Sequence, residues 1–266
     1  MLSAFKKVIC NFYLWLFSKN KLIDLNDRIL HLALRVRGFN NYEDSKASGE
    51  HFFVSQILRS INPKICIDIG ANTGDYSKMI LSHTNSRVVA FEPVSSTFTR
   101  LKESLAAFSE RAHLVQSAVG DKNCKSSIYR NVKNSGHSSL LKEAVRLDYI
   151  QQVEKEAIDV VTLDSFLEKS GISQVDLIKI DVEGFEAEVI KGAMSSIKKM
   201  RPKFIQIEFN AHQMLRGKSI LYFSEILKDY DVYQLLKDNW VKRCPLDPLS
   251  NVYYFSNFVF VRSTSN

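Results

Sequence analysis

A buried strand that ends in a glycine-punctuated turn is the feature that most constrains the fold of this chain. Residues 65–69 form a short strand that begins with the continuous apolar run 65–67, which is typical of a strand buried on both faces of a parallel sheet. Gly70 and Gly74 follow, and without a Cβ their backbone can turn tightly and approach a ligand. Asp68 lies at the carboxyl end of this strand, the edge at which open α/β sheets bind ligands.

A second strand with an acidic end indicates which ligand to expect. Residues 87–91 form another apolar run about twenty residues further on, and Glu92 follows it. An acid there can accept hydrogen bonds from a ribose diol. The segment has neither the G-x-G-x-x-G pattern of dinucleotide-binding folds nor a P-loop ending. It therefore favours an adenosine ligand without phosphates, such as S-adenosylmethionine, over an ordinary strand–helix turn.

Strands and helices alternate along most of the remaining chain, which predicts a doubly wound α/β sheet. The predicted strands are 65–69, 87–91, 113–116, 177–180, 204–208, 232–236 and 258–262. The predicted helices are 51–60, 75–82, 95–106, 185–199 and 221–228. Residues 121–165 break the alternation with strands at 126–131 and 158–163 around a loop at 134–139. We expect this segment to be an insertion over the sheet edge that carries substrate contacts.

A second acidic cluster surrounds the predicted strand 177–180. Lys179 stands among apolar residues in this strand, and a buried lysine needs a partner. Asp68, Asp181 and Glu208 are the candidates. Glu186 and Glu188 fall near a helix start, where complementing the helix dipole is a sufficient explanation for them.

Size, charge and cysteine usage indicate a single α/β domain with a short extension. The 266 residues carry a net charge of +7, but the basic residues are scattered and no nucleic-acid motif accompanies them. We read this charge as a weak bias toward acidic partners, and we expect no nucleic acid. The four cysteines form no C-x-x-C pair, which is typical of a reduced cytoplasmic protein without structural zinc.

The N-terminal segment carries a dense apolar run. Residues 1–45 have a helical pattern, and residues 8–17 are almost wholly apolar between lysines at 6, 7, 19 and 21. The run is shorter than the roughly 20 residues that a bilayer span needs, and residues 18–21 do not resemble a signal-peptide cleavage site. Two arrangements of residues 5–19 remain open. The helix packs on the α/β domain or a partner subunit, which we expect, or it lies in a membrane interface with its lysines on anionic headgroups.

The ordered set of short segments resembles FkbM-type methyltransferases over roughly residues 50–210. The matching segments are 68–74, 91–93, 118–121, 136–140, 162–164, 179–184, 192–193, 202 and 207–208. The resemblance implies a class I, Rossmann-like methyltransferase fold. This fold has a seven-stranded, mostly parallel sheet with helices on both faces and an antiparallel last strand. Residues 1–45 would form an N-terminal helical extension, and residues 46–266 the S-adenosylmethionine-dependent methyltransferase domain.

The resemblance also implies an activity, O-methylation of a hydroxyl on a sugar, a glycan or a small-molecule natural product. The cofactor residues that it implies are Asp68, Gly70, Ala71, Asn72, Gly74, Glu92, Ser117 and Ala118, with Ser117 and Ala118 bordering the adenine. Asp181 would face both cofactor and acceptor. The candidates for a general base are Asp181, Glu183, His212 and His137.

Three questions stay open at this point. Asp181, Glu208 and Asn210 are an oxygen-rich set suited to Mg²⁺, but the resemblance does not require an ion, so we expect no metal dependence. An oxidoreductase that uses NAD or a nucleotide sugar has a related fold, although the missing G-x-G-x-x-G argues against it. An inactive, methyltransferase-like binding protein is the third reading, and the intact Asp68, Glu92 and Asp181 argue against that. The sequence leaves the acceptor and the oligomeric state undetermined.

Overall fold

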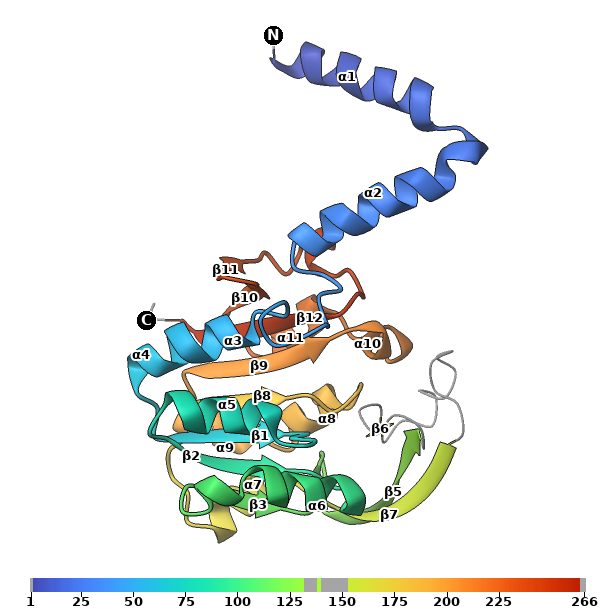
Figure 1. The fold of residues 1–266 in the computed structure, drawn as a ribbon. Helices are drawn as coiled ribbons and strands as arrows, with labels where there is room; N and C mark the ends of the chain where they lie inside the picture. Colours follow the sequence, from blue (N-terminus) through green and yellow to red (C-terminus); the bar gives the residue numbers. More distant parts are fainter. Residues whose placement is uncertain (1, 132–137, 140–152, 264–266) are drawn as a thin grey trace.

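The fold was analysed in a computed structural model, which describes residues 2–131, 138–139 and 153–263. The strands of its main sheet are β1 (Ile65–Ile69), β2 (Arg87–Phe91), β3 (Ala112–Val115), β8 (Leu177–Ile180), β9 (Phe204–Phe209), β10 (Tyr230–Leu236), β11 (Asn239–Lys242) and β12 (Ser256–Arg262). Their order is β11-β10-β12-β9-β8-β1-β2-β3 (Figure 1). The strand order reverses between β1 and β8, which creates the crevice where α/β sheets bind ligands.

The strand directions are those of the predicted Rossmann-like methyltransferase fold. Strands β9, β8, β1, β2 and β3 are parallel, whereas β12 is antiparallel to both of its neighbours, β9 and β10. The antiparallel last strand is therefore confirmed. The main sheet has eight strands rather than seven, because residues 239–242 turn back on β10 as an edge strand. Only half-buried and exposed side chains occur in β11, so it has no apolar run that would have revealed it.

Helices cover both faces of the main sheet, as predicted. Their bounds are α3 (Glu50–Phe52), η2 (Phe53–Leu58), α4 (Arg59–Ile61), α5 (Asp75–His83), α6 (Ser95–Ser104), α7 (Leu163–Lys169), α8 (Glu186–Lys191), α9 (Met194–Met200), α10 (Ala211–Leu215) and α11 (Ile220–Ile226). Successive side chains of β1 and β2 point to opposite faces, so Cys66 and Val88 join one core while Ile67 and Val89 join the other. The first core packs against η2, α5 and α6, and the second against α7, α8, α9 and α11.

Two predicted elements differ from the structure by more than a small shift of their ends. The helix predicted at 185–199 is two helices, α8 and α9, which are separated at Gly192 and Ala193. Gly192 packs directly on the backbone of Gly120. A Cβ on Gly192 would lie 1.9 Å from the carbonyl oxygen of Gly120. Leu163 begins α7 instead of ending a strand, because the Thr162 side chain accepts a hydrogen bond from the Ser165 amide at 3.1 Å and caps the helix.

The segment predicted as an insertion belongs to a second sheet. This second sheet contains β4 (Ala118–Val119), β5 (Cys124–Asn131), β6 (Ser138–Ser139) and β7 (Val153–Val161) in the order β4-β7-β5-β6. The two predicted strands are present as β5 and β7, both longer than expected at their amino ends. His137 and residues 134–136 lie outside the described residues, so their predicted role stays a prediction.

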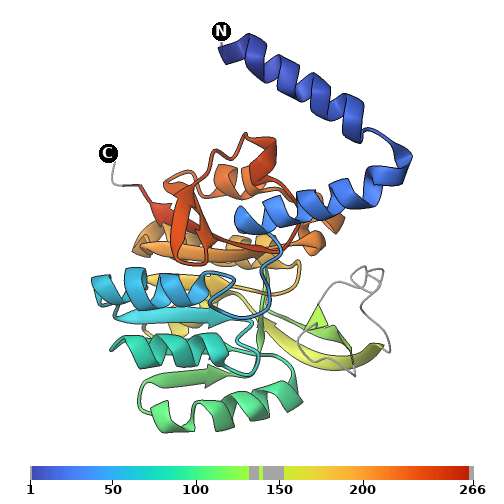
Figure 2. The same ribbon diagram turned by 45° about the horizontal axis from the view of Figure 1, so that its top comes forward.

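An arm of two helices extends from this body at the N-terminal side. Figures 1 and 2 both show α1 (Leu2–Phe17) and α2 (Ile23–Val36) leading away from the sheet. Val8, Phe12 and Trp15 are between 61% and 69% exposed, so α1 does not pack on the α/β domain and that part of the prediction is wrong. Over the part of the chain described here, no helix has the combined length and apolarity needed to cross a bilayer.

Candidate active site

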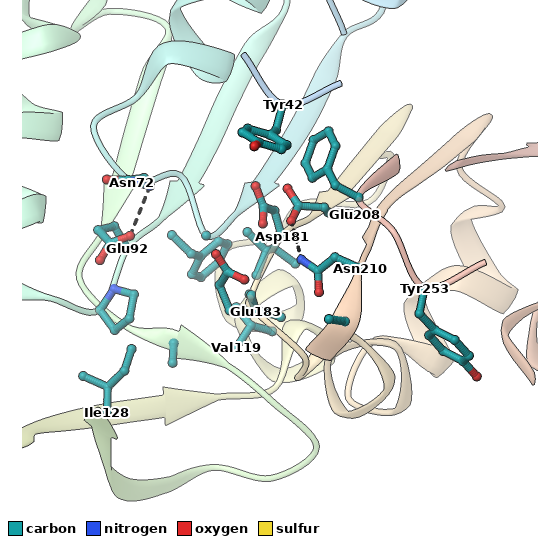
Figure 3. Close-up of a pocket in the computed structure, with 18 of the residues that line it drawn as sticks. Tyr42, Asn72, Glu92, Val119, Ile128, Asp181, Glu183, Glu208, Asn210 and Tyr253 are labelled. Carbon is teal, nitrogen blue, oxygen red and sulfur yellow. Dashed lines mark hydrogen bonds between the residues drawn. The ribbon is translucent and has the colours of Figure 1, made fainter. Parts of the chain in front are cut away.

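A cavity of about 660 Å³ opens at the carboxyl ends of the central strands. The residues that follow β1, β2 and β8 line it, together with the end of β9. In Figure 3, Asn72 and Glu92 lie on one side of this cavity, and Asp181, Glu183, Glu208 and Asn210 lie on the other. This is the topological switch point of the sheet, where the sequence predicted a ligand.

Glu92 is held by the backbone on the first side of the cavity. One carboxylate oxygen accepts a hydrogen bond from the Asn72 amide at 3.1 Å (Figure 3). The other accepts one from the Val94 amide at 2.9 Å. Burial raises the pKa of Glu92 to about 7. The Asn72 side-chain oxygen is buried and has no hydrogen-bond partner among the described residues. This side therefore offers an oriented carboxylate to a ligand, and the buried Asn72 oxygen beside it is not satisfied by any described residue.

Gly70 lies where the loops after β1 and β8 meet. Its φ is +83°, and a Cβ there would lie 1.8 Å from the carbonyl oxygen of Asp181. The amides of Gly70 and Ala71 both donate to the Phe91 carbonyl, at 3.0 and 2.9 Å. Only glycine fits this position, because it combines a left-handed backbone with direct backbone contact.

Three of the predicted cofactor residues support the cavity from behind. Gly70, Asn72, Glu92, Ser117 and Ala118 line the cavity, whereas Asp68, Ala71 and Gly74 do not. Asp68 is fully buried and accepts a hydrogen bond from the Ser77 hydroxyl at 2.6 Å. Burial raises the pKa of Asp68 above its ordinary value. Gly74 begins α5 with φ +91° and backs onto Leu101.

Lys179 joins the buried acid to the cavity. Its Nζ lies 2.8 Å from Asp181 Oδ2, 3.8 Å from Asp68 Oδ1 and 5.1 Å from the centre of the Tyr76 ring. Burial opposes its charge, but Asp181 and Asp68 outweigh burial and raise the pKa of Lys179 above its usual range. Two of the three predicted partners are therefore correct, and Glu208 makes no ion pair with Lys179.

Three carboxylates converge on the second side of the cavity. Asp181, Glu183 and Glu208 present oxygens that all lie within 4.8 Å of one another. Burial and the neighbouring charges of Asp181 and Glu183 raise the pKa of Glu208 well above its ordinary value. Glu183 has a left-handed backbone with φ 53°, which is uncommon for a residue other than glycine, asparagine or aspartate. The loop after β8 thus turns this side chain into the cavity.

His212 lies behind Glu183 and does not line the cavity. Its side chain is 1% exposed, and its Nδ1 lies 2.9 Å from both Glu183 Oε2 and Asn210 Oδ1. Both are acceptors, so Nδ1 carries a proton and donates it. Asn210 in turn donates its Nδ2 to Glu208 Oε1 at 2.7 Å (Figure 3). The histidine is placed to orient Glu183 through a network that reaches Glu208.

Glu186 has a role that the helix dipole alone does not explain. It accepts the amides of Val182 and Gly184 at 3.2 and 3.1 Å, and Gln213 donates to its other oxygen at 2.7 Å. Burial raises the pKa of Glu186 to about 7. This side chain ties the loop that bears Asp181 and Glu183 to α10.

Sequence reasoning missed an aromatic wall of the same cavity. Tyr42, Tyr253, Tyr254 and Phe255 line it, from segments at opposite ends of the chain. The Asn40 amide donates to the Phe255 carbonyl at 2.7 Å, and the Tyr42 and Phe255 rings meet edge to face with centroids 6.2 Å apart. The aromatic run immediately before β12 was the one available signal.

The chain is similar to known methyltransferases. Residues 68–236 match the family model described as "Methyltransferase FkbM domain". The chain is 25% identical over 207 residues to the 2-O-methyltransferase NoeI of Sinorhizobium fredii, covering 74% of this chain and 82% of that protein. It is 27% identical over 147 residues to the hexuronic acid methyltransferase AglP of Haloferax volcanii, covering 54% of this chain and 55% of that protein. An O-methyltransferase from Bacillus cereus, solved in complex with SAH, has a TM-score of 0.48 at 11% identity, covering 89% and 90% of the two chains.

Proposed function

This chain belongs to the FkbM methyltransferase family, and we propose that it transfers the methyl group of S-adenosylmethionine to a hydroxyl of a neutral sugar or glycan. One observation carries the proposal. A single cavity has Glu92 on one side and, across from it, Asp181 paired with the buried Lys179. The first side suits a ribose, and the second suits a hydroxyl that must lose its proton.

The described residues on the first side fit an adenosine. Each Glu92 oxygen accepts one backbone amide and keeps a lone pair for a ribose hydroxyl. Gly70 leaves the backbone open to close approach. Ser117 and Ala118 would border the base. When bound, S-adenosylmethionine supplies an electrophilic methyl group on a sulfonium.

The second side would position and deprotonate the acceptor. Lys179 fixes the Asp181 carboxylate, which can orient a hydroxyl and take its proton, and His212 holds Glu183 beside it. Each of the three carboxylates already receives a hydrogen bond or ion pair from this chain: Asp181 from Lys179, Glu183 from His212 and Glu208 from Asn210. We therefore expect transfer without a divalent cation.

Charge and aromatic content support a neutral sugar as the acceptor. Among the described residues that line the cavity there is no lysine or arginine, whereas three carboxylates face the acceptor side. A uronate would be repelled there. The Tyr42 and Phe255 rings offer π faces to the C–H groups of a sugar ring, whose partial positive charge complements the negative face.

The direct test is a methyl-transfer assay with labelled S-adenosylmethionine on neutral glycosides and on matched uronates. Transfer to a neutral glycoside that exceeds transfer to its uronate supports the proposal. Parallel titrations with S-adenosylhomocysteine and with NAD separate the alternatives. Binding of NAD alone would indicate the oxidoreductase, and binding of neither ligand would indicate an inactive fold.

We expect Glu92→Gln to weaken S-adenosylhomocysteine binding about 10- to 150-fold, because a charge-assisted hydrogen bond contributes about 1.5–3 kcal/mol. The wild type should also lose affinity as the pH falls below about 7, because the carboxylate that accepts the ribose becomes protonated. Glu92→Gln should lack this pH dependence. Calorimetry about one pH unit either side of 7 checks both results, with the exposed Glu103→Gln as the control. Unchanged affinity in folded Glu92→Gln protein would refute the ribose assignment.

We expect Tyr42→Ala to raise the KM for the sugar acceptor about 3- to 10-fold, because one aromatic contact contributes about 0.5–1.5 kcal/mol to binding. The side chain is 65% exposed, so its removal should leave the fold and S-adenosylhomocysteine affinity unchanged. Tyr42→Phe keeps the ring and should behave as the wild type. Steady-state kinetics of the three proteins make the comparison. Equal acceptor KM values in the three proteins would show that Tyr42 does not contact the acceptor.

A further inference from the structure

The arm exposes an apolar stripe along α1. Val8, Phe12 and Trp15 are 66%, 61% and 69% exposed, and Ile9 and Leu16 are 52% and 38% exposed. Their spacing of three and four residues places these five side chains on one side of the helix. Lys7 and Asn11 lie on the other side, together with Leu14, which is 52% exposed. A soluble monomer rarely exposes a contiguous apolar surface of this kind, so the stripe indicates an interaction site.

The corner between the two helices gives this surface a defined shape. The Tyr13 hydroxyl donates to Asn26 Oδ1 at 3.0 Å, and Asn26 Nδ2 donates to the Phe17 carbonyl at 3.0 Å. The Tyr13 and Phe17 rings stack with centroids 4.6 Å apart. The polar groups at the bend are thus satisfied within the arm, and Figures 1 and 2 show the arm held away from the sheet.

Charge identifies the occupant of this surface. Residues 1–23 contain four lysines, at positions 6, 7, 19 and 21, and no aspartate or glutamate. We propose that the arm docks on an anionic lipid bilayer, with α1 lying in the interface plane, its apolar stripe among the acyl chains and its lysines on the headgroups. Trp15 and Tyr13 are aromatic residues of the kind that concentrate at that depth, and Lys19 lies 5.8 Å from the centre of the Trp15 ring.

A second copy of the chain is a poorer occupant of the stripe. Packing one α1 against another would bring lysines toward lysines in a segment that holds no acid to offset them. An anionic membrane offers the opposite charge over the whole length of the helix. The proposal does not depend on the methyl-transfer reaction, so the two can be tested separately.

Vesicle sedimentation of the full chain tests the proposal. We expect binding to vesicles of equal parts phosphatidylcholine and phosphatidylglycerol, and little binding to phosphatidylcholine alone. Lys6→Glu with Lys7→Glu should weaken binding about tenfold or more, since each basic residue near the surface contributes about 1 kcal/mol. The matched control is Lys198→Glu with Lys199→Glu, the other Lys-Lys pair of the sequence, which lies in the exposed last turn of α9 and should bind as the wild type.

Trp15 provides a second readout. The chain has two tryptophans, so in a Trp240→Phe background the emission of Trp15 should shift to the blue with anionic vesicles and stay unchanged with neutral ones. Absence of both sedimentation and shift would overturn the proposal, as would anionic binding that Lys6→Glu with Lys7→Glu leaves intact. A dimer in lipid-free solution that Phe12→Glu dissociates, without vesicle binding by the wild type, would assign the stripe to a second copy.

Discussion

Asp181→Asn is expected to slow methyl transfer about 10²–10⁴-fold, the usual contribution of general-base assistance. The amide keeps the shape of the side chain and can still accept the Lys179 ammonium through its oxygen, but it cannot take a proton from the acceptor. Affinity for S-adenosylhomocysteine should change little, because Glu92 and Asn72 lie on the other side of the cavity. Single-turnover kinetics with a neutral sugar acceptor, alongside calorimetry, measure the two effects separately.

Controls for this prediction use neighbouring groups. The exposed Asp121→Asn should transfer at the wild-type rate. His212→Gln should lower the rate less than Asp181→Asn, because His212 acts only by holding Glu183. Rates measured with EDTA and with added Mg²⁺ should agree if the carboxylates work without a cation. Near-normal turnover in Asp181→Asn would exclude this carboxylate as the base, whatever the cofactor affinity.

Lys179→Met is expected to lower the free energy of unfolding by about 3–5 kcal/mol, because removal of one partner leaves buried charge uncompensated. Asp68 is fully buried, and its Oδ1 has Lys179 as its nearest positive charge at 3.8 Å. Urea denaturation of the variant checks the loss. Lys179→Arg, which keeps the charge, should lose much less, and the exposed Lys198→Met should change stability by about 0.5 kcal/mol at most.

The same variant should show a pH dependence of a defined sign. Burial already raises the pKa of Asp68, and Lys179 lowers it, so loss of Lys179 raises this pKa further. An acid whose pKa is raised on folding adds most stability below its unfolded pKa of about 3.9, and that stability is lost as the pH rises through the folded pKa. The loss in free energy of unfolding caused by Lys179→Met should therefore be smaller at about pH 5 than at about pH 8. An equal deficit at both values would contradict the role given to Asp68.

The sequence was most informative where strands are buried on both faces. The bounds of β1, β2 and β8 were predicted to the residue, because each is a short, mostly apolar segment that stops at a polar or glycine residue. Short elements escaped detection. The five-residue α10 depends on the Asn210 capping box, and the edge strand β11 depends on pairing with β10, so neither has a periodic pattern of its own.

The residues that line the cavity also differed in how well the sequence predicted them. Glu92 and Asp181 follow directly after strands, and Asn72 lies in the turn after β1, so their place at the sheet edge follows from local sequence. The aromatic wall joins Tyr42 to Phe255 across more than two hundred positions, and only the folded chain brings them together. The position of His212 behind Glu183 likewise depends on a cap that periodicity does not reveal.

The placement of β12 also sets an order of assembly during synthesis. Among the strands that the structure describes, β10 and β11 connect to the rest of the sheet only through β12, which is translated after both and inserts between β10 and β9. Until residue 262 has emerged from the ribosome, the β10–β11 hairpin has no partner strand and keeps an open hydrogen-bonding edge, which is a site for mispairing. The β1–β2–β8–β9 core can form earlier, with the cofactor side of the cavity. A nascent chain should therefore form the half of the cavity that we propose for the nucleoside before it forms the aromatic half.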